Sequence, residues 1–349
     1  MTGRWVKRPE GSNWGDFGPD DELGRLNLLT PERVRLAVEE VREGLTFCLS
    51  LPLDYPGGNL LNPRRHPPRR FATIRQGKPN YNFLLEWEEA PFTDVLSDDA
   101  VLLHTQYSTQ WDALSHVGSL FDADGDGEPE VVYYNGWRGG EHVVGPSEPH
   151  DPAEAGACSP FGGVEARRLG IEKMAQKAVQ GRGVLVDLRR HLGDVRSRIG
   201  YDQLMRIMES DGVAVEEGDL LCLHTGFAEL LLRMQRRPDR EKLNASCAAL
   251  DGRDRRLQQW IADSGIACLI ADNYAVEDYP AAPGEGRHPA LPLHELCLFK
   301  LGIHLGELWY LTELADWLHR NQRSRFLLTA PPLRLPGAVG SPVTPVATV

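Results

Sequence analysis

Short apolar segments alternate with amphipathic helical segments along this 349-residue sequence, and this alternation limits its fold more than any other feature. In residues 252–264, for example, apolar side chains recur at the spacing of one helix surface. Alternating strands and helices are typical of the α/β class, so we predict an α/β fold. The strands are expected at residues 183–188, 219–224, 266–271 and 325–329, with a further one from residue 100, and the helices at residues 165–180, 201–211 and 252–264.

The charge balance argues against several kinds of partner. The sequence has 38 Lys and Arg against 50 Asp and Glu, and the formal net charge of −12 repels the polyanionic backbone of nucleic acid. No apolar run approaches the roughly 18 residues that span a bilayer. Residues 1–7 lack the apolar stretch of a secretion signal. We therefore expect a cytoplasmic protein that binds neither nucleic acid nor membranes.

Long segments between the predicted elements are rich in proline and glycine. Thr30 and Pro31 begin a predicted helix that runs to Gly44. Residues 54–80 contain five prolines and five arginines, a composition that predicts a long surface loop. Loops of this length in a compact domain usually line a site or a subunit contact. Two further loops are expected at residues 145–163 and 277–292.

Polar side chains that could bind a ligand gather in residues 104–116. Gln106, Gln110 and Asp112 follow one another at close spacing after a predicted strand, and His116 comes just beyond them. They could converge on one chemical centre. The same residue types could equally form a buried hydrogen-bond network at a strand end, and the spacing alone does not decide between the two.

Two later segments carry further candidates. His294 and Glu307 flank an expected helix-to-strand transition at Gly302, although a surface histidine and a carboxylate at a helix start would look the same. Asp272 and Asn273 follow a predicted strand, where side chains that contact substrate often lie. The alternative for this pair is an Asx-turn that begins the next loop.

Taken together, these segments resemble the cyclase family of metal-dependent hydrolases, which includes kynurenine formamidase and isatin hydrolase. The family signature His-x-Gly-Thr-His-x-Asp-x-Pro-x-His corresponds here to Gln106-Tyr-Ser-Thr-Gln110-Trp-Asp112-Ala-Leu-Ser-His116, in which the Thr, the Asp and the final His match. Further similar blocks follow in order at residues 183–187, 218–226, 271–277, 294–307 and 332–342.

The resemblance implies a single α/β domain over residues 44–349, with a mixed, barrel-like central sheet, flanking helices and long loops. Residues 1–43 look like the N-terminal extension of longer members. Together with the long loop at residues 54–80, the resemblance also predicts that the chain forms a homo-oligomer, at least a homodimer.

The resemblance also implies roles for single residues. His116 is the expected catalytic acid and base, Asp112 a metal ligand, and His294 and Glu307 are ligands or partners of ligands. This sequence departs from the family pattern because Gln106 and Gln110 replace both metal-binding histidines. Leu114 also stands where the family usually has proline.

The two glutamines change the expected metal. An amide offers a neutral, hard carbonyl oxygen, whereas imidazole nitrogen suits zinc. The donor set Gln106, Gln110, Asp112, His294 and Glu307 therefore favours manganese or magnesium over zinc, and its affinity could be low enough for the protein to hold no metal. His104 and His224 could supply a replacement nitrogen, or they could be ordinary hydrogen-bonded histidines.

The resemblance therefore implies a hydrolase that opens an amide, lactam or lactone bond of a small cyclic or aromatic substrate. Trp111, Tyr133 and Asn273 are the candidate substrate contacts, with core packing as the alternative for the two aromatic residues. Two other functions stay open. One is a metal-independent dehydratase or cyclase that uses His116 and Asp112, and the other is a non-catalytic small-molecule binding protein.

Overall fold

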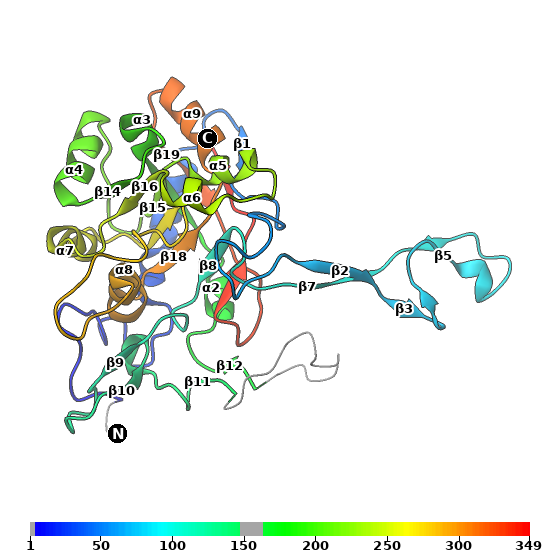
Figure 1. Ribbon diagram of the computed structural model, residues 1–349, viewed down its shortest axis with the longest axis horizontal. Helices are drawn as coiled ribbons and strands as arrows, with labels where there is room; N and C mark the ends of the chain where they lie inside the picture. Colours follow the sequence, from blue (N-terminus) through cyan, green and yellow to red (C-terminus); the bar gives the residue numbers. More distant parts are fainter. Residues whose placement is uncertain (1–3, 147–162) are drawn as a thin grey trace.

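A curled, mixed sheet forms the centre of the computed structural model, which describes residues 4–146 and 163–349 (Figure 1). Its four middle strands are parallel, and antiparallel strands extend the sheet on both sides. The predicted α/β fold with a mixed central sheet is confirmed. Within the described residues the strand order is β1 (Thr46–Cys48), β21 (Val346–Thr348), β19 (Arg325–Thr329), β13 (Gln180–Asp187), β15 (Leu220–His224), β17 (Cys268–Ala271), β18 (His304–Glu307), β8 (Gln110–Asp112) and β20 (Gly340–Pro342).

Helices flank this sheet, as predicted, and several are shorter than the sequence suggested. The helix expected over residues 165–180 spans only seven residues, because its start is paired as a strand and Ala178 ends it with a left-handed backbone. The helices are α1 (Pro31–Val38), α2 (Ile171–Lys177), α3 (Leu188–Leu192), α4 (Tyr201–Ser210), α5 (Phe227–Arg233), α6 (Arg240–Asn244), α7 (Arg255–Asp263), α8 (Pro292–His294), which continues as a π-helical segment (Glu295–Leu301), and α9 (Thr312–Arg320). Short 3-10 turns occur at Gly24–Leu28, Leu85–Trp87 and Tyr134–Gly136.

Side-chain caps fix where some helices begin. The Thr30 hydroxyl accepts a hydrogen bond from the Arg33 backbone N–H at the start of α1, as its Thr-Pro sequence predicts. Asp254 caps α7 by accepting from the N–H groups of Arg256 and Leu257. None of the helices in the described part of the chain has the length and apolar character needed to cross a bilayer.

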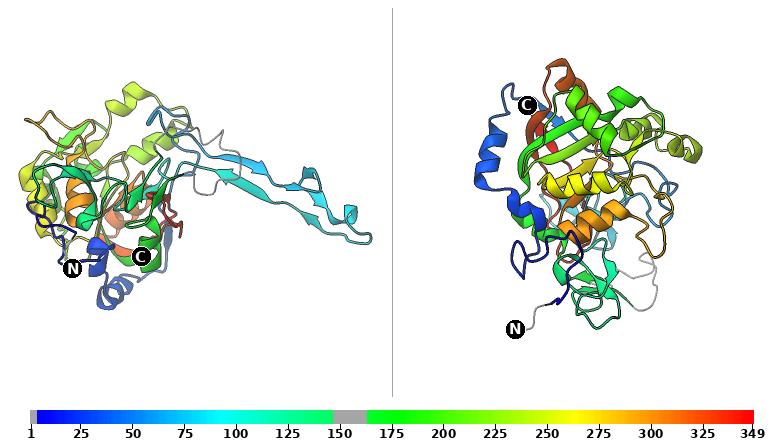
Figure 2. Two further views of the ribbon diagram at one scale, coloured as in Figure 1. Left: turned by 90° about the horizontal axis from the view of Figure 1, so that it is seen from below. Right: turned by 90° about the vertical axis from the view of Figure 1, so that its left-hand side faces the viewer.

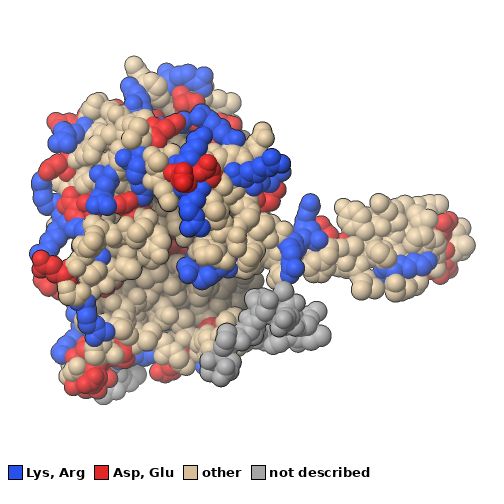
Figure 3. Space-filling model, viewed as in Figure 1, with Lys and Arg blue, Asp and Glu red and all other residues tan. Residues whose placement is uncertain are grey.

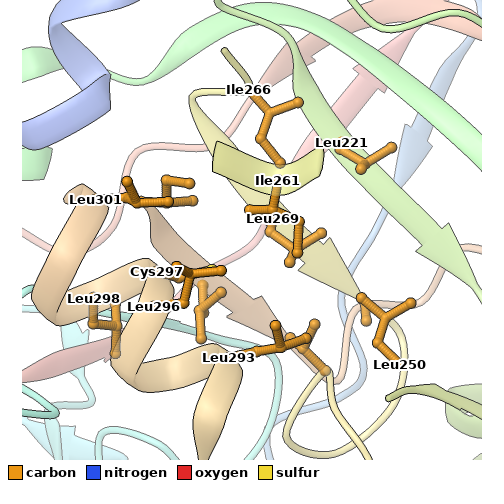
Figure 4. Close-up of a cluster of buried hydrophobic side chains, with 14 of the residues drawn as sticks. Leu221, Leu250, Ile261, Ile266, Leu269, Leu293, Leu296, Cys297, Leu298 and Leu301 are labelled. Carbon is orange, nitrogen blue, oxygen red and sulfur yellow. The ribbon is translucent and has the colours of Figure 1, made fainter. Parts of the chain in front are cut away.

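Two apolar clusters lie on the two faces of the sheet. Successive side chains of a strand point to opposite faces, so Val184 and Val186 join the first cluster while Leu185 joins the second. Strands β15 and β17 divide their side chains in the same way. Figure 4 shows part of the first cluster, where side chains from α7, β17 and the π-helical segment meet.

The N-terminal segment is part of these cores. Trp14 is almost fully buried in the first cluster, and its indole N–H donates a 2.7 Å hydrogen bond to the Phe299 carbonyl. Leu26 lies in the second cluster. The backbones of Gly24 and Gly302 touch so closely that a Cβ on Gly24 would lie 2.2 Å from the Gly302 carbonyl oxygen. Residues 4–43 therefore pack as one body with the rest of the domain.

A long β arm, residues 69–102, projects from the body (Figures 1 and 2). The sequence predicted a loop over residues 54–80 and a strand running on from residue 100, and both expectations need correction. Within that range, residues 69–72, 74–75 and 78–79 pair as strands, and the strand at residue 100 ends at Leu102 because it belongs to the arm. The arm consists of the antiparallel pairs β2 (Arg69–Ala72) with β7 (Asp99–Leu102), β3 (Ile74–Arg75) with β4 (Lys78–Pro79), and β5 (Phe83–Leu84) with β6 (Val95–Leu96).

Three small strand pairs complete the described structure: β9 (Ser119–Phe121) with β10 (Glu130–Val132), β11 (Val143–Val144) with β12 (Glu165–Ala166), and β14 (Ser197–Ile199) with β16 (Ala248–Leu250). Most of the loop expected at residues 145–163 lies outside the described residues. The loop expected at residues 277–292 is irregular up to α8.

Candidate functional site

Asp112, His294 and Glu307 come together where β8 pairs with β18. Glu307 stands opposite Gln110, and Leu305 stands opposite Asp112. Side chains that face each other across an antiparallel pair leave the sheet on the same side, so the two carboxylates point the same way. His294 reaches them from the end of α8, and one ligand atom of each of the three residues lies within 4.8 Å of the others. All three side chains are buried.

The His294 imidazole bridges two carboxylates. Its Nδ1 lies 2.8 Å from Glu277 Oε1, and its Nε2 lies 3.2 Å from Glu307 Oε1. Burial alone would lower the pKa of His294, but these two bonds outweigh it and raise the pKa to about 10. Burial would likewise raise the pKa of Glu307, and the His294 contact holds it below its ordinary value. Glu277 also accepts the backbone N–H groups of Leu293 and His294.

Both glutamines turn their amide nitrogens towards these carboxylates. Gln106 Nε2 donates to Asp112 Oδ1 at 2.6 Å, and Gln110 Nε2 donates to Glu307 Oε2 at 2.9 Å. Gly340, opposite Asp112 on β20, leaves room for the first contact, since a Cβ there would lie 2.7 Å from Gln106 Cγ. The structure thus brings all five predicted metal-site residues, Gln106, Gln110, Asp112, His294 and Glu307, into one cluster.

His116 lies at the edge of this cluster. Its Nε2 is 3.9 Å from Asp112 Oδ1, and its side chain remains partly exposed. Burial lowers the pKa of His116, although the nearby Asp112 opposes that shift. Burial also raises the pKa of the Asp112 carboxyl. The imidazole is therefore neutral near pH 7 and can accept a proton.

The donor atoms of the cluster fit a cation. Asp112 Oδ2 and Gln110 Oε1 are buried and have no hydrogen-bond partner among the described residues. Unpaired buried acceptors are costly, and a bound cation is one way to satisfy them. Carboxylate and amide oxygens with one imidazole suit a hard divalent ion.

A pocket of 280 Å³ opens beside the cluster and gives it access to small molecules. His116, His294 and Glu307 line it together with Arg65 and Tyr274. Arg65 Nη1 donates to the Gln106 carbonyl at 2.7 Å, and the Tyr274 hydroxyl accepts from Asn62 Nδ2 at 3.2 Å. The sequence did not predict Arg65, Tyr274 or Asn62 as site residues. Arg65 lies in the arginine-rich loop, which was the one signal for it.

The three predicted substrate contacts lie elsewhere. Trp111 is fully buried on the opposite side of β8 from Asp112, where its indole N–H donates to the Ala330 carbonyl at 2.8 Å. Tyr133 is half-buried and packs against the first core cluster. Asn273 donates to the Ala248 carbonyl and lines a neighbouring 450 Å³ pocket. None of the three lines the pocket beside His116. Successive side chains of β8 point to opposite faces of the sheet, so Trp111 points away from the pocket. Tyr133 and Asn273 pack against other parts of the domain.

The two histidines considered as replacement ligands are also outside the cluster. His104 Nδ1 contacts the backbone of His66 at the base of the arm. His224 lies between Asp187 and Thr312, at 2.8 Å and 3.2 Å. Both are hydrogen-bonded histidines in this structure.

Comparison with known proteins identifies the family. The Cyclase family model, described as "Putative cyclase", matches residues 49–278. A crystal structure of a novel cyclase is 31% identical, and the match covers 97% of each chain with a TM-score of 0.72. The chain belongs to the cyclase family. The family predicted from the signature segment and the later blocks is therefore confirmed.

Other solved structures share the fold of this cyclase-family chain at lower identity. Isatin hydrolase A from Labrenzia aggregata, bound to benzyl benzoate, is 15% identical with a TM-score of 0.54, over 90% of this chain and 96% of that one. Isatin hydrolase A from Ralstonia solanacearum is 14% identical with a TM-score of 0.52, over 91% and 98%. None of the curated proteins compared with the chain matches it.

Proposed function

We propose that this cyclase-family protein is a divalent-metal-dependent hydrolase that opens an amide, lactam or lactone bond of a small cyclic or aromatic substrate. One observation carries the proposal: Asp112, His294 and Glu307 lie within ligand distance of one another beside a pocket that His116 also lines. A bound divalent ion would polarise the scissile carbonyl and lower the pKa of water.

The residues that would hold the ion favour metal ions that prefer oxygen ligands. Asp112 and Glu307 offer carboxylate oxygens, and Gln110 offers an unpaired amide oxygen. His294 is the one imidazole among these donors, and to hold the ion its Nε2 would give up the proton that it shares with Glu307, while Nδ1 stays on Glu277. Manganese or magnesium therefore suits the set better than zinc.

His116 performs the proton transfers in this proposal. It is neutral near pH 7, so its Nε2 takes a proton from the water that attacks the substrate carbonyl. Asp112, 3.9 Å away, stabilises the resulting imidazolium. When the C–N or C–O bond breaks, His116 returns the proton to the leaving nitrogen or oxygen.

Donors on the other wall of the pocket orient the substrate. The Tyr274 oxygen already accepts from Asn62, which leaves its O–H free to donate. The Arg65 guanidinium is anchored to the Gln106 carbonyl and carries further N–H groups. These groups suit a substrate with a second carbonyl or a carboxylate next to the scissile bond.

A second function has a specific observation in its favour. His294 is a buried cation between Glu277 and Glu307, and the two glutamine amides bond to Asp112 and Glu307. Asp112 and Glu307 therefore each have at least one hydrogen-bond partner without a metal ion. A metal-independent dehydratase or cyclase that uses His116 and Asp112 is the alternative.

The test is an activity screen of metal-free protein with manganese, magnesium or zinc added back. The panel contains an aromatic lactam such as isatin, N-formyl aromatic amides and aromatic lactones, with a His116→Ala variant as the control. We expect hydrolysis that requires manganese or magnesium and His116. Metal-independent dehydration would establish the alternative, and no hydrolysis of the panel with any of the metals would refute the proposal.

A further inference from the structure

A second pocket, of 450 Å³, lies next to the one that His116 lines. Tyr274 and Tyr279 line both pockets, and their rings meet edge to face with centroids 6.4 Å apart. The two rings therefore separate the two pockets. Among the described residues that line the second pocket, none belongs to the candidate metal cluster.

Part of the wall of this second pocket is apolar and aromatic. Phe227 begins α5, Leu243 lies in α6, and both are almost fully buried in a small third apolar cluster. Tyr274 packs against the same cluster. Walls of apolar and aromatic side chains suit a flat ring, which can bury both of its faces against them.

The remaining wall carries an excess of positive charge. Arg196 precedes β14, Arg198 lies within it, and both donate to Asp278: Arg198 Nε lies 2.7 Å from Asp278 Oδ2, and Arg196 Nη2 bonds to Oδ1. These three are the charged residues among the described lining residues, so one carboxylate serves two guanidinium groups. Each guanidinium has five N–H donors, which leaves both arginines able to bind a further anion.

An unpaired amide oxygen adds a separate indication of a ligand. Asn273 is only 2% exposed, and its Nδ2 donates to the Ala248 carbonyl at 3.0 Å. Its Oδ1 is buried and has no hydrogen-bond partner among the described residues. A buried acceptor without a partner is costly, and an N–H group of a ligand in the pocket would satisfy it.

The positive charge of this pocket is a local property. The chain as a whole has a formal net charge of −12. In Figure 3 acidic and basic side chains are mixed over the body of the molecule. An anion is therefore attracted by the arginines that line the pocket, because the overall charge of the protein repels it.

We infer that the second pocket is a binding site for a small aromatic carboxylate that also carries an amine or amide N–H. The carboxylate binds to Arg196 and Arg198, the ring packs against Phe227 and Tyr274, and the N–H donates to Asn273 Oδ1. Each chemical group of such a ligand meets a group of the pocket that can bind it.

This ligand class has a connection with the candidate reaction, and the connection rests on the proposed function. Opening an aromatic lactam with water breaks the C–N bond and leaves a carboxylate and an amine on one molecule. The product then belongs to the class that the second pocket binds. A ligand that contacts Tyr274 also touches a residue that orients the substrate in the neighbouring pocket.

Calorimetric titration of the full, metal-free chain with 4-aminobenzoate is the first test. It requires no turnover, so its result does not depend on whether the protein is a hydrolase. We expect one site per chain. Benzoate lacks the N–H donor and aniline lacks the carboxylate, and each should bind at least about tenfold more weakly. Undetectable binding of 4-aminobenzoate, or equal binding of all three compounds, would overturn the inference.

Arginine variants test which pocket binds the ligand. The double variant Arg196→Gln, Arg198→Gln should bind 4-aminobenzoate at least about tenfold more weakly. Arg167→Gln, Arg256→Gln is the matched control, because it removes the same charge from side chains that are 56% and 64% exposed, and it should bind like the wild type. Arg65→Gln, in the pocket beside His116, should also bind normally. Binding that only the Arg65 variant loses would overturn the assignment.

A variant that fills the pocket tests the site without breaking its ion pairs. Asn244 is an exposed residue at the end of α6 that lines the second pocket. Asn244→Trp places a large ring there and leaves Arg196, Arg198 and Asp278 unchanged, so it should abolish binding. Melting temperatures show which variants fold. A folded Asn244→Trp variant that binds 4-aminobenzoate as tightly as the wild type would contradict the inference.

Discussion

Glu277 Oε1 lies 2.8 Å from His294 Nδ1 in the buried interior of the domain. The same carboxylate accepts the backbone N–H groups of Leu293 and His294, so it fixes both the start of α8 and the orientation of the imidazole. Gly252 makes room for it, because a Cβ there would lie 2.2 Å from Glu277 Oε2. One residue thus supports both the fold and the candidate site.

Removing Glu277 should therefore destabilise the protein strongly. Glu277→Ala leaves a buried His294 cation and two helix N–H groups without their acceptor, and losses of about 3–5 kcal/mol are typical for breaking a buried pair. Glu277→Gln keeps one acceptor oxygen and should lose less. Denaturant unfolding measures both values, and an alanine variant within about 0.5 kcal/mol of the wild type would show that the contact contributes little.

His116 should matter for turnover far more than for folding. It is partly exposed at the pocket, so His116→Ala removes proton transfer without opening the core. Proton-transfer groups contribute about 10²–10⁴ in rate, and kcat should fall by that factor with an unchanged melting temperature. His191→Ala on α3 is the matched control, because the His191 side chain is 25% exposed and that of His116 is 23% exposed. Near-normal turnover in the His116 variant would reject the assigned role.

The double change Gln106→His, Gln110→His should raise zinc affinity sharply. Both amides already contact the site carboxylates, so imidazoles at these positions would face the same centre. Imidazole nitrogen is a better zinc donor than an amide oxygen. Calorimetric titration of wild type and variant with zinc and manganese makes the comparison. An unchanged zinc affinity would show that the new imidazoles do not reach the ion.

The His224–Asp187 pair should make stability depend on pH. Burial lowers the pKa of His224, but the Asp187 bond and the charge of Asp272 outweigh burial and the opposing charge of Arg189, so its pKa is raised above the ordinary 6.5. Protonated His224 therefore stabilises the fold fully below pH 6.5, and this contribution is lost as the pH rises through the folded-state pKa.

Asp187→Asn tests this dependence, because asparagine can still cap α3 at the same position. Between pH 6 and pH 9 the wild type should lose more unfolding free energy than the variant. Parallel curves for the two proteins would mean that the pair does not titrate as described.

The sequence predicted β13, β15, β17 and β19 of the nine-stranded central sheet, and it predicted the residues of the central cluster. Strands such as β17 are continuous apolar runs, and burial between two cores requires that pattern. The cluster of Asp112, His294 and Glu307 was found through the family resemblance, because residues so far apart in the chain carry no local signal of their contact.

Beyond His116, His294 and Glu307, the sequence did not predict which side chains line the pocket. Trp111 lies between Gln110 and Asp112 in the sequence. Successive side chains of a strand point to opposite faces, so Trp111 points into the second core cluster. The arm was also missed. Its prolines and arginines indicated a loop, and only the long-range pairing of β2 with β7 makes it a ribbon.

The most direct test of the proposed site is metal binding by the chain itself. Metal-free wild-type protein should bind about one manganese ion per chain in a calorimetric titration, since Asp112, His294 and Glu307 form one group of ligands. Glu307→Gln should lose that binding, and Glu313→Gln, an exposed residue on α9, should retain it. A wild type that binds neither manganese nor magnesium, or a Glu307 variant that binds as tightly as the wild type, would contradict the account.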